Sequence, residues 1–352
     1  MASGGFRLLQ LCPHDSPPFG ELCRSFAAAA RREGGTVRTV YLGEPAGQAL
    51  PEADYLRVRR LSDNRSLGSA LRESLAAEAP YDLVLAHRYR AYRAALAAGL
   101  PAARLVVLAH EYGMLNDVSR RLHRRLFGRG ATFAGVSLPV ARELAGVTGR
   151  ECVLPNVLAG DAEPLARDAA RAALTLPAQA PLIGVVGRLH YKKRPLLACA
   201  VHALVRQSRP DVGLVFLGAG PDEAEIRRAG GDNVYLPGVV ADARRYMGAF
   251  DVLLHTGDHE AFGMVLLEAM AAGVPPVVGP LAVAAGPLWV LDGHGYAAAE
   301  DSAAAYADAL LEALGEPPGQ AAARRAHVTQ HFSPAALQQR LAALVSEVGR
   351  QA

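Results

Sequence analysis

Short apolar runs alternate with longer alanine-rich segments along the whole chain, and this alternation constrains the fold more than any other feature. The apolar runs have the length of buried strands, and the segments between them have the length and composition of helices. Strands that alternate with helices form parallel sheets, because each helix returns the chain to the start of the next strand. A chain of 352 residues is too long for one hydrophobic core, so we expect two α/β domains.

The expected strands form two groups, separated by a polar, alanine-rich connector at residues 159–168. In the first group we expect strands at Arg7–Leu11, Val37–Leu42, Asp82–Ala86, Leu105–Ala109 and Phe133–Val136, and helices at Glu21–Arg32, Ser66–Glu78 and Leu138–Ala145. In the second group we expect strands at Leu182–Val186, Val212–Leu217, Val234–Leu236, Val252–His255 and Pro276–Val278. A final helix starts at Ser333-Pro334, with proline at the first helical position. We therefore predict one domain over residues 1–160, a second over 161–332, and a C-terminal helix in 333–352.

Two glutamates in the second half, Glu260 and Glu268, lie eight positions apart across a predicted junction of loop and helix. Gly263 lies at this junction and permits close approach of a ligand to the backbone. The free N–H groups at the helix start, among them those of Phe262 and Gly263, favour an anion. Glu268, about one turn inside the helix, is placed to accept hydrogen bonds from two neighbouring hydroxyls, as on a ribose. The alternative is an amphipathic helix with two solvated acids.

A basic turn follows the predicted strand Leu182–Val186. The strand ends at Gly187, and four cations follow within seven positions, namely Arg188, Lys192, Lys193 and Arg194. A diphosphate leaving group needs its charge neutralised by a metal ion or by fixed cations. Because the chain contains no Asp-x-Asp pair, we expect Arg188 and Lys193 to bind a diphosphate without a metal ion. The alternative is a solvated basic turn.

These two segments, in this order, resemble the retaining GT-B glycosyltransferases of family 4, with their E-x7-E motif. The stretches Val153-Leu154-Pro155-Asn156, Leu214–Pro221 and Asn233–Gly238 agree with the same family, and the resemblance is densest from Leu182 to Val278. It implies the GT-B fold, in which two Rossmann-like domains with parallel sheets face a central cleft. The C-terminal domain would bind the nucleotide-sugar donor, the N-terminal domain the acceptor, and the last helix would return to the N-terminal domain.

The resemblance also implies an activity. We expect transfer of a hexose from a UDP- or GDP-sugar to a glycan or glycolipid, with retention of configuration and with no metal or other cofactor. The arginine-rich first half and a composition typical of bacteria lead to the hypothesis of a role in lipopolysaccharide or other cell-surface polysaccharide synthesis. Glu260 would orient the sugar hydroxyls and Glu268 would hold the ribose. A nucleotide-sugar epimerase of the same fold and a non-catalytic scaffold are the alternatives.

The first half offers further candidates at predicted strand ends. His110 directly follows the strand Leu105–Ala109, where the family places a histidine near the reacting carbon of the donor sugar. Gly20 ends the first strand–helix turn, where the family has a glycine-rich loop beside the diphosphate. His87 and Arg88 follow another strand and are candidates for contacting the acceptor, with a surface role as the alternative.

Several other classes of protein are disfavoured. Gly218 and Gly220 invite a dinucleotide interpretation, but Glu223 occupies the third glycine position, so we treat them as turn glycines and do not expect a dehydrogenase. The four cysteines have no metal-ligand spacing, and no apolar run approaches the length of a membrane span. We find no nucleic-acid-binding motif and expect no nucleic-acid partner.

The formal net charge of +3 hides an asymmetry between the halves. Residues 1–160 carry 21 arginines against 14 acidic residues, a net charge of +7, whereas residues 161–352 have a net charge of −4. Five arginines lie between Arg120 and Arg129, mostly on a predicted helix from Asn116 to Phe127 whose Leu122 and Leu126 we expect to face the domain. Such a face would suit an anionic membrane surface or a phosphorylated glycolipid, and a solvated face is the alternative. We expect a cytoplasmic protein, with peripheral contact to the inner membrane face as a hypothesis.

Overall fold

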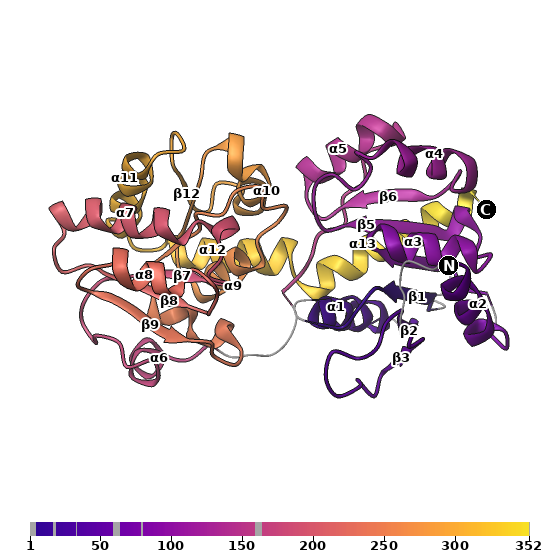
Figure 1. Ribbon diagram of the computed structural model, residues 1–352, viewed down its shortest axis with the longest axis horizontal. Helices are drawn as coiled ribbons and strands as arrows, with labels where there is room; N and C mark the ends of the chain where they lie inside the picture. Colours follow the sequence, from indigo (N-terminus) through magenta and orange to yellow (C-terminus); the bar gives the residue numbers. More distant parts are fainter. Residues whose placement is uncertain are drawn as a thin grey trace. The chain divides into compact units, whose positions relative to one another are not determined.

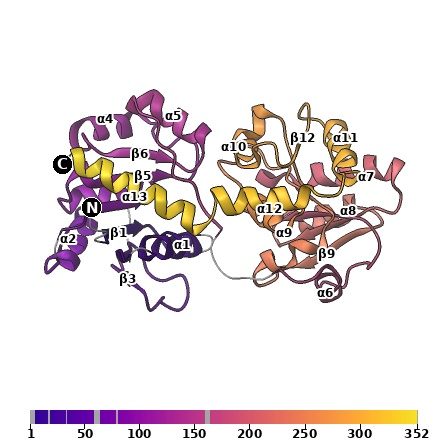
Figure 2. The same cartoon turned by 180° about the vertical axis from the view of Figure 1, so that it is seen from behind.

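Two compact units make up the computed structural model, which describes residues 5–16, 19–32, 34–58, 64–78, 80–158 and 164–351. Unit 1 comprises Met1–Ala159 and Phe332–Ala352, and unit 2 comprises Gly160–His331. Figures 1 and 2 show the chain from opposite sides. The domain boundary predicted at residues 160 and 161 lies outside the described residues.

Unit 1 is built on a parallel sheet with the strand order β3-β2-β1-β4-β5-β6. Its strands are β1 Arg7–Cys12, β2 Thr36–Tyr41, β3 Ala53–Tyr55, β4 Leu83–His87, β5 Leu105–Ala109 and β6 Thr132–Gly135. Its helices are α1 Phe19–Arg31, α2 Asn64–Leu75, α3 Arg88–Ala97, the 3-10 helix η1 Ala102–Arg104, α4 Val118–Phe127, α5 Leu138–Thr148 and α13 Pro334–Gln351. Strands β4 and β5 are buried along their whole length, as expected for parallel strands covered on both faces.

The last helix, α13, completes unit 1. Its buried residues Leu337, Leu341, Leu344 and Val348 recur at helical spacing and form one apolar face. That face packs against α1, β4 and η1, so a segment from the end of the chain covers a sheet formed by its beginning. Figure 2 shows α13 in yellow beside α1.

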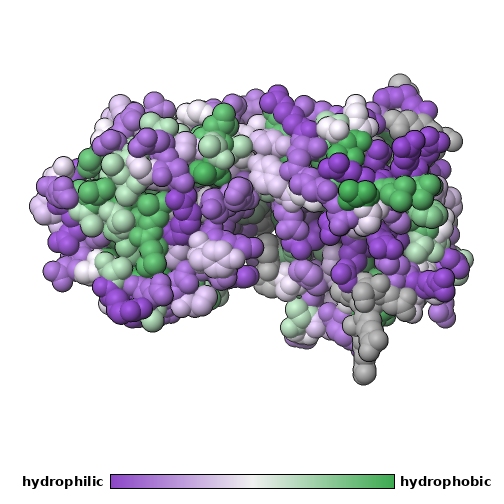
Figure 3. Space-filling view, turned by 45° about the horizontal axis from the view of Figure 1, so that its top comes forward, coloured by the Kyte–Doolittle hydropathy of each residue, from purple (hydrophilic) through white to green (hydrophobic). Residues whose placement is uncertain are grey.

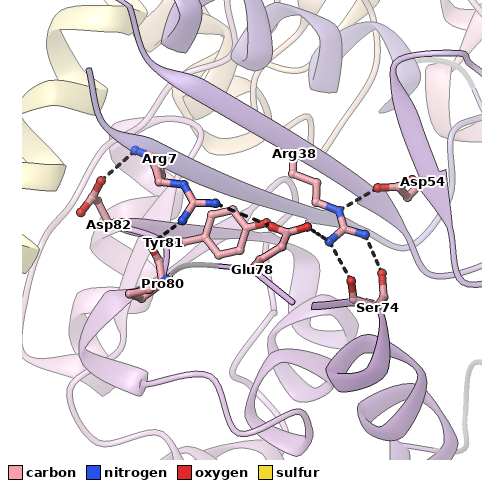
Figure 4. Close-up of polar contacts among 8 residues, drawn as sticks. All are labelled: Arg7, Arg38, Asp54, Ser74, Glu78, Pro80, Tyr81 and Asp82. Atoms are coloured by element: carbon pink, nitrogen blue, oxygen red, sulfur yellow. Dashed lines mark hydrogen bonds and ion pairs between the residues drawn. The ribbon is translucent and has the colours of Figure 1, made fainter. Parts of the chain in front are cut away.

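A polar network holds the amino-terminal side of this sheet together (Figure 4). Arg38 on β2 donates to Asp54 of β3 at 2.7 Å and to the Ser74 hydroxyl of α2 at 2.7 Å. The amide of Arg7 donates to Asp82 at 2.8 Å, which joins the start of β1 to the start of β4. These contacts tie α2 and the strand starts to one another, so the network has a structural role.

Unit 2 repeats the same architecture, with the strand order β12-β11-β10-β7-β8-β9. Its strands are β7 Leu182–Val186, β8 Gly213–Leu217, β9 Val234–Gly238, β10 Val252–Leu254, β11 Pro276–Val278 and β12 Tyr296–Ala297. Its helices are α6 Arg167–Ala173, η2 Tyr191–Lys193, α7 Pro195–Ser208, α8 Glu223–Ala229, η3 Ala243–Ala249, α9 Met264–Ala272, α10 Leu281–Leu291, α11 Ala303–Leu314 and α12 Gln320–His331.

Both sheets have the doubly wound order of Rossmann-like domains. The strand order reverses between β1 and β4 in unit 1 and between β7 and β10 in unit 2. Loops that leave the carboxyl ends of such neighbouring strands diverge to opposite faces and leave a crevice for a ligand. The topology therefore directs attention to the ends of these four strands.

Helix α4 differs from its prediction in the face that it exposes. Leu122 and Leu126 are 54% and 62% exposed, so the prediction that they face the domain is wrong. Three of its arginines make contacts within the unit instead: Arg120, Arg121 and Arg124 donate to backbone carbonyls at 3.0, 2.7 and 3.0 Å. Guanidinium groups satisfy these carbonyls, which leucine side chains cannot do, and the leucines are left outward.

Candidate functional site

The two motifs singled out in the sequence meet at the switch point of unit 2. Strands β7 and β10 pair in parallel, so the turn after β7 and the loop after β10 leave the same edge of the sheet. The ammonium of Lys193, in η2, contacts the carboxylate of Glu260, in the loop before α9. A cation and an acid 67 positions apart in the sequence thus form an ion pair where the topology favours a ligand.

The environment of Glu260 keeps it ionised. Burial would raise the pKa of its carboxyl group, but the His255 ring, whose Nε2 lies 3.6 Å away, and the charge of Lys193 outweigh burial and hold the pKa well below its usual value. Because the pKa is depressed in the folded state, this carboxylate stabilises the fold above an unfolded-state pKa of about 4.3, and the contribution is lost as the pH falls. Near neutral pH Glu260 only accepts hydrogen bonds, which suits contact with hydroxyl groups.

Two residues of this site were missed in the sequence, His255 and Thr256. The Thr256 hydroxyl, 1% exposed, lies 2.8 Å from the Lys193 carbonyl and 3.1 Å from the Arg194 carbonyl, and so holds the basic turn in place. His255 is 6% exposed, and neither ring nitrogen has a hydrogen-bond partner within the described ranges. The available signal in the sequence was the presence of these two polar residues directly after an apolar strand. The carbonyls that Thr256 contacts belong to the basic turn, more than sixty positions away, so the contact itself was not predictable.

Close backbone approach explains the glycines around the basic turn. A Cβ at Gly218 would lie 2.0 Å from the Gly187 carbonyl oxygen, and its φ of +149° also disfavours a side chain. The turns after β7 and β8 therefore touch through backbone, which confirms Gly218 as a turn glycine. Gly263 is the N-cap residue of α9, with a φ of +91°. A glycine has no side chain to accept hydrogen bonds from the first N–H groups of the helix, as expected where a ligand is to bind them.

The remaining donor candidates lie on the same two segments. Arg188 is exposed on the turn after β7, and its guanidinium makes no ion pair within the part of the chain that the structure describes. Glu268 is half-buried in the second turn of α9. Phe262 is 3% exposed, and its ring lies 6.3 Å from that of Trp289 in α10, so its side chain anchors the loop.

Helix α10 supports the loop that carries Glu260. A Cβ at Gly286 would lie 2.4 Å from the Ala261 carbonyl oxygen, so the helix backbone rests directly on the loop backbone. The helix is kinked at Ala284, where φ is −126°, and the Val283 carbonyl accepts from the His259 amide at 3.2 Å. The loop is therefore held from behind by backbone contacts.

In unit 1, the carboxyl ends of β1, β4 and β5 bring two histidines together. His87 Nδ1 and His110 Nε2 are 2.9 Å apart, and the rings stack with centroids separated by 5.2 Å. Arg88 follows with a φ of +70°, and its guanidinium lies over the Phe19 ring at 4.4 Å. Strained backbone at a strand end is found preferentially at functional sites.

Gln10 fixes the direction of hydrogen bonding through the two histidines. Its side-chain nitrogen donates to the Cys23 carbonyl at 3.0 Å, and a carbonyl only accepts. The Gln10 oxygen therefore accepts from His87 Nε2 at 3.3 Å, and His87 Nδ1 in turn accepts from His110 Nε2. This assignment leaves His110 Nδ1 as a buried acceptor that has no partner among the described residues. Burial lowers the pKa of His87 to about 3 and that of His110 well below its usual value, so both rings are neutral, as the assignment requires.

Replacing Gln10 with leucine should disturb this arrangement. His87 would lose the acceptor that fixes its tautomer, so His110 would exchange between tautomers. In the wild-type protein we expect an unprotonated His110 Nδ1, which 15N NMR of histidine-labelled protein detects directly. Thr39→Val is the control, because the Thr39 hydroxyl accepts from the Gln10 side-chain nitrogen, at 3.2 Å, and not from the oxygen that His87 contacts. An unaltered His110 spectrum in Gln10→Leu would show that Gln10 does not set the tautomer.

Two candidates in unit 1 need correction. His87 is fully buried and both its ring nitrogens are engaged within the unit, so the prediction that it contacts an acceptor is wrong. Gly20 lies in helix α1 rather than in a loop, and a Cβ there would meet the Asp15 carbonyl oxygen at 2.6 Å. This contact explains why position 20 is a glycine. That Gly20 lies beside the diphosphate stays a prediction. Pro17 and Pro18 of the same turn lie outside the described residues.

A doubly wound sheet with a lysine–glutamate pair at its switch point places unit 2 in the class of Rossmann-like ligand-binding domains. Residues 180–316 match the family model described as glycosyl transferases group 1. The predicted resemblance to the group 1 glycosyltransferases is thereby confirmed for residues 180–316, the region that carries both motifs.

Individual proteins agree with the family match. The chain is 33% identical over 116 residues to a GDP-mannose-dependent alpha-mannosyltransferase of Mycolicibacterium smegmatis, covering 32% of this chain and 29% of the relative. It is 32% identical over 112 residues to the lipopolysaccharide core biosynthesis glycosyltransferase LpsE of Rhizobium meliloti, covering 30% of this chain and 32% of the relative. The matches thus span about a third of the curated relatives' length.

Among solved structures, Anabaena HepE in complex with UDP-glucose superposes with a TM-score of 0.76. The identity is 22%, and the alignment covers 97% of this chain and 100% of HepE. At this identity the likeness establishes the fold alone, and the predicted fold class of two Rossmann-like domains is confirmed.

Proposed function

We propose that the protein is a glycosyltransferase that moves a hexose from a nucleotide sugar to a glycan or glycolipid acceptor. The observation that carries this proposal is the ion pair of Lys193 with ionised Glu260 at the switch point of unit 2. Arg188 extends the positive charge on the same turn, and Glu268 follows on the helix that the Glu260 loop enters. Cations on one side and carboxylates on the other match a ligand that has a diphosphate and many hydroxyls.

Each residue has a defined task in this proposal. Arg188 and Lys193 bind the diphosphate and stabilise its charge as the sugar departs. Glu268 accepts hydrogen bonds from the ribose. Glu260, with the backbone amides of Phe262 and Gly263, orients the sugar hydroxyls. In unit 1, His110 is the candidate for contact with the reacting sugar, and its free Nδ1 would accept a hydrogen bond from a hydroxyl.

A thermal-shift screen with UDP-, GDP- and ADP-sugars tests donor binding. We expect a UDP- or GDP-sugar to raise Tm, since a ligand at a hundred times its Kd stabilises a fold by about 2.7 kcal/mol. Incubation of the bound donor with candidate acceptors should then yield a glycoside. An epimer formed from the nucleotide sugar alone would favour the epimerase, and binding without turnover would favour the scaffold. No shift with any nucleotide sugar would contradict the proposal.

Transfer with retention and without a metal ion is the finer form of the proposal. Its support is the pair of fixed cations on the basic turn, which supplies charge where a metal ion otherwise would. Activity should persist in EDTA, and NMR of the product should show the anomeric configuration of the donor. Loss of activity in EDTA, restored by a divalent metal, would contradict metal independence.

We propose that helix α4 contacts an anionic membrane surface, with its exposed apolar side chains taking part as well as its arginines. Its outward side chains Val118, Leu122, Leu126 and Phe127 are 76%, 54%, 62% and 63% exposed. Exposed apolar side chains beside arginines are typical of helices that lie in the membrane interface. Figure 3 shows green patches bordered by purple on the unit drawn at the right. Within the described ranges no helix is both long and apolar enough to cross a bilayer.

Leu122→Ser combined with Leu126→Ser should reduce binding to vesicles that contain anionic lipid. Each leucine would otherwise bury apolar area in the interface, so we expect about a tenfold loss, measured by cosedimentation. Leu196→Ser with Leu281→Ser is a matched control, because these leucines of unit 2 are 39% and 70% exposed. Equal vesicle binding by the two double variants would contradict a membrane role for α4.

We also propose a cytoplasmic location and a role in lipopolysaccharide or surface polysaccharide synthesis. Both proposals follow from an acceptor that is a glycolipid at the membrane surface.

A further inference from the structure

Helices α2, α3 and α4 of unit 1 border two adjoining hollows. The first has a volume of about 430 Å3, and we call it the basic pocket. The second has a volume of about 420 Å3, and we call it the apolar groove. Asn64, Arg93 and His123 line both, so the two hollows adjoin each other at these residues.

The basic pocket is lined by several positively charged side chains. Arg90, Arg93 and Arg120 line it, and none of the lining residues within the described ranges is acidic. Neither Arg90 nor Arg93 makes an ion pair or side-chain hydrogen bond within the described part of the chain, and Arg93 Nε is buried without a partner. A buried donor such as Arg93 Nε is costly unless a ligand supplies an acceptor, whereas Arg90 is exposed and adds charge at the same pocket. Oxygen atoms of an anion would satisfy both side chains.

Contacts between side chains and backbone hold the walls of the pocket. Arg120 donates to a backbone carbonyl at 3.0 Å, and its guanidinium lies 5.0 Å from the centre of the Tyr89 ring. The Tyr89 hydroxyl donates to the Arg120 carbonyl at 3.4 Å, which joins α3 to α4. Burial, followed by the charge of Arg93, lowers the pKa of His123, so the positive charge here comes from guanidinium groups, which stay charged at every working pH.

The apolar groove continues from the basic pocket along α3. Leu96 and Leu100 line it, with Phe127 at the end of α4, and the lining residues Ala97 and Gly99 leave it open. Phe127 is also one of the exposed apolar side chains of α4, with Val118, Leu122 and Leu126, so the groove leads toward these residues. A ligand that fills both hollows must have an anionic group at one end and a hydrocarbon chain at the other.

We propose that the basic pocket and the apolar groove together bind an anionic amphiphile, a phosphate ester of a long-chain alcohol or acylglycerol. The phosphate accepts hydrogen bonds from Arg90 and Arg93, and the chain lies against Leu96, Leu100 and Phe127. As an acceptor site this inference rests on the proposed glycosyl transfer and narrows the acceptor class to phosphate-bearing lipids. Binding of the amphiphile itself requires no turnover and is measured separately.

Isothermal titration with decyl phosphate, below its micelle concentration, tests the site. Inorganic phosphate supplies the anion alone and decyl glucoside supplies the chain alone. We expect decyl phosphate to bind at least about tenfold more tightly than either, because the two hollows then contribute together. If inorganic phosphate binds equally well, the ligand is a free phosphate and the amphiphile is wrong. If decyl glucoside binds equally well, the basic pocket has no part in recognition.

Paired variants assign the binding to these residues. Arg90→Gln with Arg93→Gln should weaken decyl phosphate binding at least about tenfold, since charge-assisted hydrogen bonds are lost. Arg31→Gln with Arg32→Gln removes the same charge from exposed positions of unit 1 and should change binding little. Leu96→Ser with Leu100→Ser should reduce binding of decyl phosphate to the level of inorganic phosphate. Equal affinities in the pocket and control variants would overturn the proposal.

The nucleotide-sugar thermal shift is measured on the same variants. It reports on unit 2, so it should be retained in all of them and shows that each variant is folded. Loss of amphiphile binding with the shift retained supports the site. A wild-type protein that shifts with nucleotide sugar but does not bind decyl phosphate refutes this inference and leaves the proposed function intact.

Discussion

Replacing Arg188 and Lys193 together with alanine should lower kcat/KM for the nucleotide sugar by about a thousandfold. Removing a single positioned group that stabilises transition-state charge costs about a hundredfold or more, and here both cations of the basic turn are lost. Lys193→Ala also deprives Glu260 of its ion-pair partner, so the pKa of Glu260 should rise toward the usual range. Steady-state kinetics and nucleotide titration measure the effect.

Lys192→Ala is the control for this experiment. Lys192 is the chain's other lysine, lies on the same 3-10 helix and is exposed, so its loss changes the net charge of the turn without touching Glu260. We expect activity within about twofold of wild type, the range usual for an exposed charge. If the double variant keeps its nucleotide affinity and turnover, then diphosphate binding by the basic turn is wrong.

Gly286→Ala should lower kcat by about a hundredfold while leaving the fold intact. The new methyl group would lie 2.4 Å from the Ala261 carbonyl oxygen, so α10 and the Glu260 loop must move apart. A displacement near 1 Å at a positioned group costs on the order of a hundredfold in rate. Such overpacking also costs about 1–3 kcal/mol of stability, which a urea titration detects.

Gly146→Ala provides the comparison. Gly146 also lies within a helix, α5, but apart from the adjoining backbone of that helix no atom of the described residues is within 4 Å of its added Cβ. Alanine there should leave kcat unchanged and keep or raise stability, because alanine is the better helix former. A Gly286→Ala variant with normal kcat would mean that the loop tolerates the shift and that α10 has no part in positioning Glu260.

The strands were predictable because their signals are local. Leu105–Ala109, Leu182–Val186 and Pro276–Val278 were predicted with the bounds that the structure shows, since each is an apolar run of strand length. The edge strands β3 and β12 were missed, because β3 has three residues and β12 two and neither forms an apolar run. Helix α3 was also missed, because arginines and tyrosines fill its first turns.

Side-chain orientation was harder to predict, because it depends on partners distant in the sequence. The apolar spacing of α4 is the same whether Leu122 faces inward or outward, and backbone carbonyls that bind the arginines decide the outcome. His87 has a polar side chain at a strand end, yet it is buried because Gln10, 77 positions away, accepts from its ring. Neither partner is visible in a window of neighbouring residues.

Because α13 belongs to unit 1, a shortened chain that keeps unit 1 must retain both ends of the sequence. Unit 2 is one uninterrupted stretch, whereas unit 1 is assembled from two pieces that flank it, as in a host protein with an insertion. The Leu158 amide donates to the Phe332 carbonyl at 2.9 Å, so the two junctions are adjacent. Excising the insert and joining these ends with a short linker preserves the whole host, while truncation after the first piece strips a hydrophobic face from α1.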